Sequence, residues 1–198
     1  MTAIIPLKAL DHSKQRLAPR LAADERRALM ATLFTHVARV CADSPAIASI
    51  VAVVGDDAGA ALARDVGVAS MRERGGGLNA ALRQATTEVD DDASLIVVAD
   101  LPRLTGTDLD RMVGAGGPVP CVVVAPTQDG GTGALLRRPP DVIAPAFGPA
   151  SAAAHLTAAR SAGVRAALLA TAGLAHDVDR PADLGSPPAG GNDHRPHL

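Results

Sequence analysis

The stretch Ala99-Asp100-Leu101-Pro102 places a carboxylate directly after a short apolar run. That run, residues 95–98, is rich in Val and Ile, which is typical of a buried strand in an α/β sheet. Asp100 is expected to end this strand, because Pro102 cannot continue the pairing. Ligands of open α/β sheets bind beyond the carboxyl ends of the strands, so Asp100 is a candidate for chemistry.

A second acidic pair, Asp177 and Asp179, comes late in the chain and is followed by Pro181. Three carboxylates at strand ends are suited to hold Mg²⁺ together with the phosphate groups of a substrate. The set of Asp100, Asp177 and Asp179 therefore predicts phosphoryl or nucleotidyl transfer.

Lysine is rare in this chain: of 19 Lys and Arg residues, only Lys8 and Lys14 are lysines. Such a ratio, with abundant Ala, Gly and Pro, is typical of a GC-rich genome that favours Arg. A position that keeps Lys under this bias can require a compact ammonium group. Chance on a solvated loop is the alternative, but the segment with Lys8, Lys14 and Arg16 directly follows the first expected strand, which favours a function.

A Gly-rich turn, residues 75–77, precedes an expected helix and is followed by Asn79. Glycines let the backbone approach a ligand closely, and helix N-termini attract anionic groups. Gly76 and Gly77 are therefore candidates for nucleotide binding, and Asn79 for a hydrogen bond to a base or ribose. The chain lacks both the P-loop motif and a G-x-G-x-x-G after the first strand, which argues against those two nucleotide sites.

Another set of candidate residues lies near the start of the expected helix over residues 151–162. Its members, Thr132, Gly148 and Ser151, could together bind a small phosphate monoester. The simpler interpretation of Ser151 is an N-cap. His155, one turn inside that helix, is expected to be a packed or surface histidine rather than a base.

Length and composition predict one domain over residues 1–184 with a sizeable core. The tail, residues 185–198, is rich in Pro and Gly and is expected to be disordered. A net charge of -2 gives no basic field for nucleic acid. No apolar run is long enough to span a bilayer, and Lys8 and Asp11 interrupt the apolar start, so no signal peptide is expected. Cys41 and Cys121 are expected to be buried thiols rather than a disulfide, which fits a cytoplasmic location.

The hydrophobic pattern predicts alternating strands and helices, and hence a mostly parallel sheet that helices cover on both faces. Strands are expected over residues 2–7, 50–54, 68–71, 95–100, 120–125, 133–136 and 164–170, and helices over residues 23–42, 58–65, 78–86, 107–113 and 151–162, with a last helical turn at residues 181–184.

Taken in order, these motifs resemble the 2-phospho-L-lactate/phosphoenolpyruvate guanylyltransferase family of coenzyme F-420 biosynthesis. The resemblance covers Ile4 to about Leu184. The matching motifs are Pro6-Leu-Lys8 with Lys14-Gln-Arg16-Leu, Gly77-Leu78-Asn79, Ala99-Asp100-Leu101-Pro102, Asp129-Gly-Gly-Thr132, Phe147-Gly148-Pro-Ala-Ser151 and Asp177-Val-Asp179-Arg-Pro181. Each motif is weak alone, and their ordered combination is fairly specific. Arg180 departs from the family, which usually has Thr before this proline.

The resemblance implies a Rossmann-like nucleotidyltransferase fold of the glycosyltransferase-A type, an α/β three-layer sandwich with a mostly parallel mixed sheet. It implies that the chain joins GMP from GTP to phosphoenolpyruvate or 2-phospho-L-lactate and releases pyrophosphate.

The resemblance also implies roles for single residues. Asp100, Asp177 and Asp179 match the positions that bind the metal, expected to be Mg²⁺. Lys8, Lys14 and Arg16 match the segment that meets the nucleotide phosphates and, with Asp100, form the expected catalytic set. Thr132, Gly148 and Ser151 match the positions for the acceptor phosphoenolpyruvate.

Two other functions stay open at this point. A nucleotidyltransferase of the molybdopterin or sugar-phosphate type is one, although its usual Gly-rich, Arg-containing first loop is absent. A non-catalytic nucleotide-binding protein of the same fold is the other, and it predicts binding without turnover. The expected partners are GTP and a small phospho-acid, with neither nucleic acid nor membrane. The sequence leaves open a homodimer and the choice among phosphoenolpyruvate, 2-phospho-L-lactate and 3-phosphoglycerate.

Overall fold

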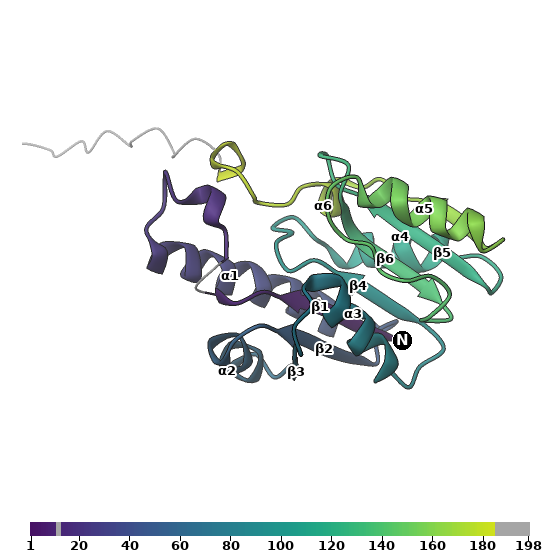
Figure 1. The fold of residues 1–198 in the computed structure, drawn as a ribbon, viewed down its shortest axis with the longest axis horizontal. Helices are drawn as coiled ribbons and strands as arrows, with labels where there is room; N and C mark the ends of the chain where they lie inside the picture. The colour runs from purple at the N-terminus through teal and green to yellow at the C-terminus, as the bar shows by residue number, and fades with distance from the viewer. Residues whose placement is uncertain (11–12, 185–198) are drawn as a thin grey trace, which may run out of the picture.

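A single seven-stranded sheet organises the computed structural model, which describes residues 1–10 and 13–184. The expected disorder of residues 185–198 therefore lies outside the described residues. The strand order is β3-β2-β1-β4-β6-β5-β7 (Figure 1). The strands are β1 (Thr2–Leu7), β2 (Ser49–Val54), β3 (Ala69–Arg72), β4 (Ser94–Val97), β5 (Cys121–Pro126), β6 (Thr132–Arg138) and β7 (Arg165–Leu168).

Six α-helices lie along the described part of the chain, and each is close to its predicted position where one was predicted. They are α1 (Ala23–Ala42), α2 (Asp57–Asp65), α3 (Leu78–Thr87), α4 (Gly106–Ala115), α5 (Ser151–Ser161) and α6 (Ala172–Ala175), with 3₁₀ helices at Gln15–Leu17 and Pro181–Leu184. The sequence did not predict α6 or the first 3₁₀ helix.

The sheet is mixed but mostly parallel, as predicted. β1 pairs in parallel with β2 and β4, β2 with β3, and β5 with β7, whereas β6 is antiparallel to both β4 and β5. β6 is thus the only reversed strand within the described residues.

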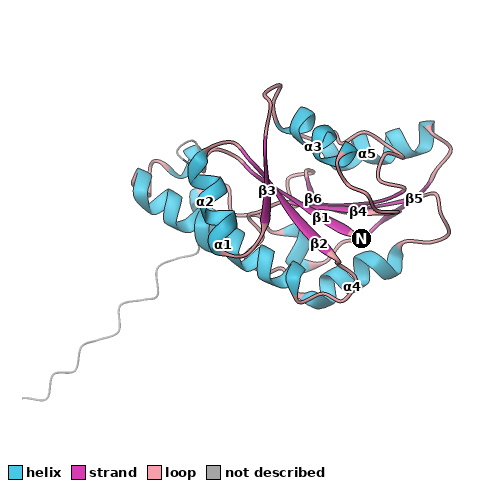
Figure 2. Ribbon diagram, turned by 90° about the horizontal axis from the view of Figure 1, so that it is seen from below, coloured by secondary structure: helices cyan, strands magenta, loops and turns pink. Residues whose placement is uncertain are grey.

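Helices cover both faces of the sheet, which makes the three layers that were predicted (Figure 2). Side chains alternate between the faces, so that Ile5 belongs to the core to which α1, α2 and α4 contribute, while its neighbour Ile4 belongs to the core to which α3 and α5 contribute. Both faces of β4 are therefore buried, which explains its unbroken apolar sequence.

The predicted end of β4 is wrong: β4 ends at Val97, so Asp100 lies in the turn beyond the strand rather than at its last position. The amide of Val98 still donates to the carbonyl of Gly133 at 3.0 Å, which is the last contact with β6. Leu101, fully buried, then draws the turn into the core.

The short helix α6 packs against β6 and α4 at two glycines. A Cβ on Gly133 would lie 2.1 Å from the carbonyl oxygen of Leu174, and one on Gly173 would lie 2.1 Å from Oδ2 of Asp108. Only glycine permits these approaches. They fix the segment that leads to Asp177.

The strand order reverses between β1 and β4, because the chain runs outward from β1 to β3 and then returns to the other side of β1. Loops that follow such neighbouring strands diverge and leave a crevice in which ligands bind. The loops after β1 and β4 carry Lys14 and Asp100. Since β6 is antiparallel, its first residue, Thr132, lies at this same edge of the sheet.

Candidate active site

Lys14 and Asp100 form an ion pair across the crevice between β1 and β4. The Lys14 side chain is 6% exposed and the Asp100 side chain 21%, so the pair lies under the surface of the crevice. Lys14 adopts a left-handed backbone conformation, with φ 52°, directly before the 3₁₀ helix. The structure therefore brings together two of the predicted catalytic residues.

Asp56 holds the base of the loop that carries Lys8 and Lys14. Its Oδ2 accepts the amide of Leu10 at 2.6 Å, and its Oδ1 caps α2 by accepting the amide of Gly59 at 2.7 Å. Lys8 itself is exposed. Sequence reasoning missed Asp56, although an Asp directly before a helix is a recognisable N-cap.

Asp177 is held next to Asp100 by the backbone, because the amide of Val178 donates to the carbonyl of Asp100 at 3.1 Å. Burial, and then the charge of Asp100, raise the pKa of the Asp177 carboxyl above its ordinary value; Lys14 acts weakly in the opposite direction. Two carboxylates that repel each other in a partly buried crevice have the chemistry of a cation site.

Asp179 is turned elsewhere and forms an ion pair with Arg16. In Figure 1 the yellow end of the described chain comes close to the purple segment that precedes α1. Among residues 1–10 and 13–184, no group of three or more His, Cys, Asp or Glu side chains is close enough to hold a metal ion. The three predicted ligands are thus not assembled as one set: Asp100 and Asp177 are neighbours, and Asp179 stands with Arg16.

The Gly-rich turn before α3 has a backbone that only glycine adopts readily, with φ of 87°, 84° and 80° at Gly75, Gly76 and Gly77. Asn79, just after it, has a structural role that was not predicted. Its amide oxygen accepts the amide of Phe147 at 2.7 Å, and its amide nitrogen donates to the carbonyl of Phe147 at 2.9 Å. Asn79 therefore fixes the segment before Gly148, and its predicted contact with a base or ribose stays a prediction.

Thr132 and Ser151 meet side chain to side chain, with 2.9 Å between their hydroxyl oxygens, and both are buried. The N-cap interpretation of Ser151 is wrong, because α5 starts at Ser151 and its N-cap is Ala150, which has no side-chain cap. Gly148, exposed and with φ 141°, shapes the turn that leads to Ala150. The structure thus gathers the three residues predicted to bind an acceptor anion.

The first amides of α5 are not free for an anion, contrary to the expectation for a helix N-terminus. The amide of Ser151 donates to Gly148 at 3.1 Å and that of Ala152 to Gly130 at 3.3 Å. The turn that contains Gly130 is held in turn by Asp129, whose Oδ1 accepts the Thr127 hydroxyl at 2.6 Å. The hydroxyl groups of Thr132 and Ser151 therefore offer donors that these two helix amides do not.

His155 is fully buried beneath this hydroxyl pair, which confirms that it is a packed histidine. Its Nδ1 lies 3.1 Å from Oγ1 of Thr132, and its Nε2 accepts the amide of Ala146 at 2.9 Å. Burial, and to a lesser degree the nearby Arg137, lower its pKa to about 4. The imidazole is therefore neutral at pH 7.

Acid is expected to destabilise the protein through this histidine. The folded state binds the His155 proton only below pH about 4, whereas the unfolded chain binds it below its ordinary pKa of 6.5, so stability rises with pH between these values. Acidification from pH 7 to 4 should remove on the order of 3 kcal/mol through His155 alone. Urea unfolding at pH 7 and pH 4.5 should show a smaller pH effect in His155→Gln than in the wild type.

His36→Gln is the matched control for this measurement, because His36 is a half-buried histidine on α1 that bonds only the carbonyl of Leu104 among the described residues, at 3.0 Å. Its pH dependence, compared with that of His155→Gln, separates the loss of His155 from the loss of any partly buried histidine. An equal pH dependence in His155→Gln and the wild type would show that His155 does not hold its lowered pKa.

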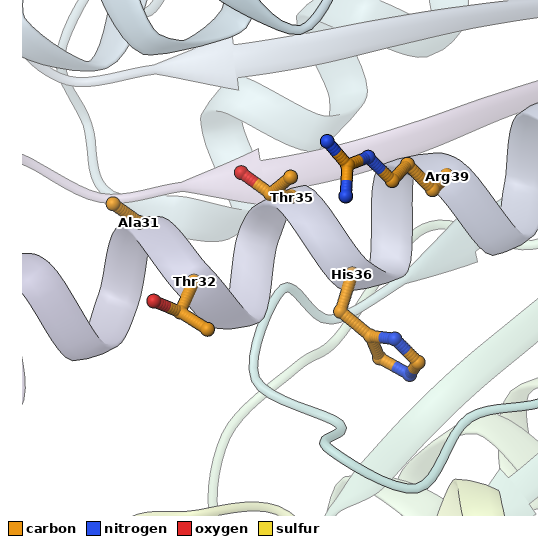
Figure 3. Close-up of a pocket in the computed structure, with 5 residues that line it drawn as sticks. All are labelled: Ala31, Thr32, Thr35, His36 and Arg39. Carbon is orange, nitrogen blue, oxygen red and sulfur yellow. The ribbon is translucent and has the colours of Figure 1, made fainter.

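A surface pocket on α1 lies apart from these residues (Figure 3). It is lined by Ala31, Thr32, Thr35, His36 and Arg39. None of the residues predicted from the sequence to form the site lines it, so the candidate site is the crevice at the strand ends.

Two further observations concern the helices and the cysteines. No helix in the described part of the chain is long and apolar enough to cross a membrane. Cys41 and Cys121 are both buried and free, as predicted.

Comparison with known proteins finds one family model over nearly the whole chain, "Guanylyl transferase CofC like", which matches residues 1–196. The phosphoenolpyruvate guanylyltransferase of Sphaerobacter thermophilus is 40% identical over 186 residues, 92% of this chain and 89% of that protein. The 3-phospho-D-glycerate guanylyltransferase of Colwellia psychrerythraea is 29% identical over 184 residues, 91% of this chain and 88% of that protein.

Among solved structures, a nucleotidyl transferase from Methanothermobacter thermautotroptrophicus superposes with a TM-score of 0.66 at 14% identity. The match covers 92% of this chain and 93% of that one. At this identity the likeness concerns the fold, which is the Rossmann-like α/β nucleotidyltransferase fold that was expected.

Proposed function

Since the chain belongs to the family of CofC-like guanylyl transferases, we propose that it joins GMP from GTP to phosphoenolpyruvate and releases pyrophosphate. The observation that supports the proposal is that two pairs of predicted site residues lie at one edge of the sheet. The Lys14–Asp100 pair lies in the crevice at the topological switch point, and the Thr132–Ser151 hydroxyl pair lies at the first residue of β6 beside it.

The reaction needs no covalent enzyme intermediate. A phosphate oxygen of the acceptor attacks the α-phosphorus of GTP, a new P–O bond forms, and the bond to the β-phosphate oxygen breaks as pyrophosphate leaves. The acceptor phosphate is already anionic, so no general base is required. The obstacles are repulsion between two anions and the charge that develops on the leaving group.

The chain's own residues answer these two obstacles. The buried ammonium of Lys14 and the exposed side chains of Lys8 and Arg16 supply positive charge for the triphosphate and the pyrophosphate. Thr132 and Ser151 donate hydrogen bonds to the acceptor. The three glycines of residues 75–77 let the backbone approach the nucleotide.

A divalent cation fits the pair of Asp100 and Asp177, because the two carboxylates lie close enough for one to raise the pKa of the other. We propose Mg²⁺, which is commonly held by one or two carboxylates together with substrate phosphates. When bound, such an ion neutralises negative charge on the triphosphate and the leaving pyrophosphate. Asp179 is a less favoured candidate ligand than Asp100 and Asp177, because its carboxylate is already paired with Arg16.

Pyrophosphate release is the test of the function. With GTP and Mg²⁺, we expect turnover with phosphoenolpyruvate that exceeds turnover with 2-phospho-L-lactate or 3-phosphoglycerate. ATP and CTP, as donor controls, should give at most about a tenth of the rate, and EDTA should abolish it until Mg²⁺ is restored.

The outcomes separate the alternatives. Turnover with another phospho-acid would keep guanylyl transfer and replace the acceptor, and the relative named for 3-phospho-D-glycerate makes that acid the first to compare. Turnover with CTP or a sugar phosphate would favour a different nucleotidyltransferase. Binding of GTP without turnover on any acceptor would favour a non-catalytic nucleotide-binding protein.

The proposal has consequences for organisation and location. Residues 1–184 act as one domain, because one sheet unites β1 through β7 and the loops of the site come from both halves of it. The two buried free thiols suit a reducing compartment such as the cytoplasm.

A further inference from the structure

The hydroxyl pair of Thr132 and Ser151 is joined to a buried histidine that the transfer reaction does not itself use. His155 is 0% exposed, and both of its ring nitrogens have partners, so the ring has no polar atom left for the acceptor. Nε2 lies 2.9 Å from the amide nitrogen of Ala146, and Nδ1 lies 3.1 Å from Oγ1 of Thr132.

The direction of these hydrogen bonds follows from chemistry. The amide of Ala146 can only donate, so Nε2 of His155 accepts and carries no hydrogen. A neutral imidazole has one N–H, which must then be on Nδ1 and must donate to Thr132. The Thr132 hydroxyl, having accepted, points its own hydrogen toward Oγ of Ser151, 2.9 Å away. The hydrogen of Ser151 is left without a partner within this chain of bonds.

We propose that His155 is a positioning residue that makes the Thr132–Ser151 pair a donor of hydrogen bonds to the acceptor anion. The donors run in one direction, from the backbone amide of Ala146 to the hydroxyl of Ser151. This rests on the proposed function, in which that anion is the phospho-acid.

The physical need for such a device is simple. A hydroxyl group can donate or accept, and an unoriented pair would present lone pairs to an incoming anion as readily as hydrogens. A phosphate or carboxylate oxygen is an acceptor only. With Thr132 accepting from His155 and donating to Ser151, the hydrogen of the Ser151 hydroxyl is the one available to the anion, and it is already oriented when the anion binds.

The surroundings of His155 hold the ring in place. Its ring meets Phe147 edge to face, with 5.1 Å between centroids and 68° between planes. Asn79 holds the backbone of Phe147 on both sides, at 2.7 and 2.9 Å. His155 therefore has a packing role as well, and the experiment must separate packing from the orientation of Thr132.

A double-mutant cycle of His155 and Thr132 separates the packing role of His155 from its orientation of the Thr132 hydroxyl. His155→Gln keeps an acceptor near Ala146 and loses the donor to Thr132. We expect it to raise the KM for phosphoenolpyruvate on the order of 10-fold, with the KM for GTP unchanged. In the Thr132→Val background, where there is no hydroxyl to orient, the same substitution should change that KM by less than about 2-fold. His155→Asn, whose amide nitrogen replaces Nδ1, should recover most of the loss.

His36→Gln, outside the site, should leave both KM values as in the wild type. If His155→Gln raises the KM for phosphoenolpyruvate equally in both backgrounds, or raises the KM for GTP as much, His155 serves packing alone and the inference is wrong. Should His155→Gln not fold, His155→Met, which fills the volume next to Phe147 and has no donor, takes its place in the cycle.

Calorimetry keeps this inference distinct from the proposed function. The dissociation constant of phosphoenolpyruvate is measured with and without an α,β-methylene analogue of GTP, which cannot react. Binding without turnover in the wild type would overturn guanylyl transfer, while the same cycle in dissociation constants would still decide on His155. Binding of no phospho-acid would overturn both.

Discussion

Asp100→Asn is expected to lower turnover at saturating GTP and phosphoenolpyruvate about 100-fold or more, which corresponds to roughly 2.7 kcal/mol of lost transition-state stabilisation. The substitution keeps the shape of the side chain and removes its negative charge. That charge holds Lys14 in the crevice and, with Asp177, makes the cation site. The fold should change little, because asparagine still accepts a hydrogen bond from Lys14. The kcat from pyrophosphate release at several Mg²⁺ concentrations is the measurement.

Asp110→Asn is the matched control, since Asp110 is an exposed carboxylate on α4 and the change in charge is identical. It should keep the activity of the wild type. Turnover of Asp100→Asn within about 3-fold of the wild type, with the thermal midpoint unchanged, would remove Asp100 from the catalytic set. A loss of activity that follows a lower midpoint would instead mean that Asp100 serves stability.

Much of the fold could be predicted because local pattern and tertiary packing agree. The helix over Ala23–Ala42 has its predicted bounds, since its apolar spacing matches the face that α1 buries. The parallel strands β1 and β4 are buried on both faces, which their apolar runs indicate directly. The reversed strand β6 was predicted only in part, as residues 133–136, because nothing local distinguishes it from its parallel neighbours.

The helix α6 could not be predicted for a physical reason. It has four residues, and its position depends on contacts that lie far away in the sequence. Gly133 and Gly173 permit those contacts, but neither glycine indicates a close contact in the sequence, because the partner is known only from the structure. The end of β4 at Val97 is a similar case, because the burial of Leu101 decides where the chain turns.

The candidate site also contains residues that the sequence predicts and residues that it does not. The residue types of Lys14, Asp100, Thr132 and Ser151 were signals in the sequence, and the structure brings them into two contacting pairs. The partners that orient these residues could not be recognised in the sequence. A histidine inside a helix gives the same sequence pattern whether it only packs in the core or also forms a hydrogen bond to a site residue. The role of His155 depends on its contact with Thr132, the first residue of β6, which is 23 residues away in the sequence. No local sequence pattern around His155 indicates that contact.

Lys14→Ala is expected to lower kcat about 100-fold, and Lys14→Arg is expected to restore less than about a tenth of the lost activity. Lys14 is 6% exposed, in a left-handed backbone conformation, and its ammonium pairs with Asp100. A guanidinium is wider, presents its donors as a planar fork and would have to displace the pair. The measurement is kcat and the KM for GTP, at matched Mg²⁺, for both variants.

Arg16 supplies the matched comparison, because it is also a basic residue of the same loop but is 66% exposed, and its ion pair with Asp179 is open to solvent. Screening by water makes such a pair weak, so Arg16→Lys should cost less than about 5-fold in kcat and should keep the charge that the pyrophosphate needs. Near-normal turnover in Lys14→Arg would mean that position 14 requires only a positive charge. The lysine at this position would then be present by chance. A loss in Arg16→Lys as deep as in Lys14→Ala would place the reacting phosphates nearer to Arg16 than to Lys14. The contrast between the two positions therefore tests whether burial in the crevice, rather than net charge on the loop, makes a basic residue catalytic.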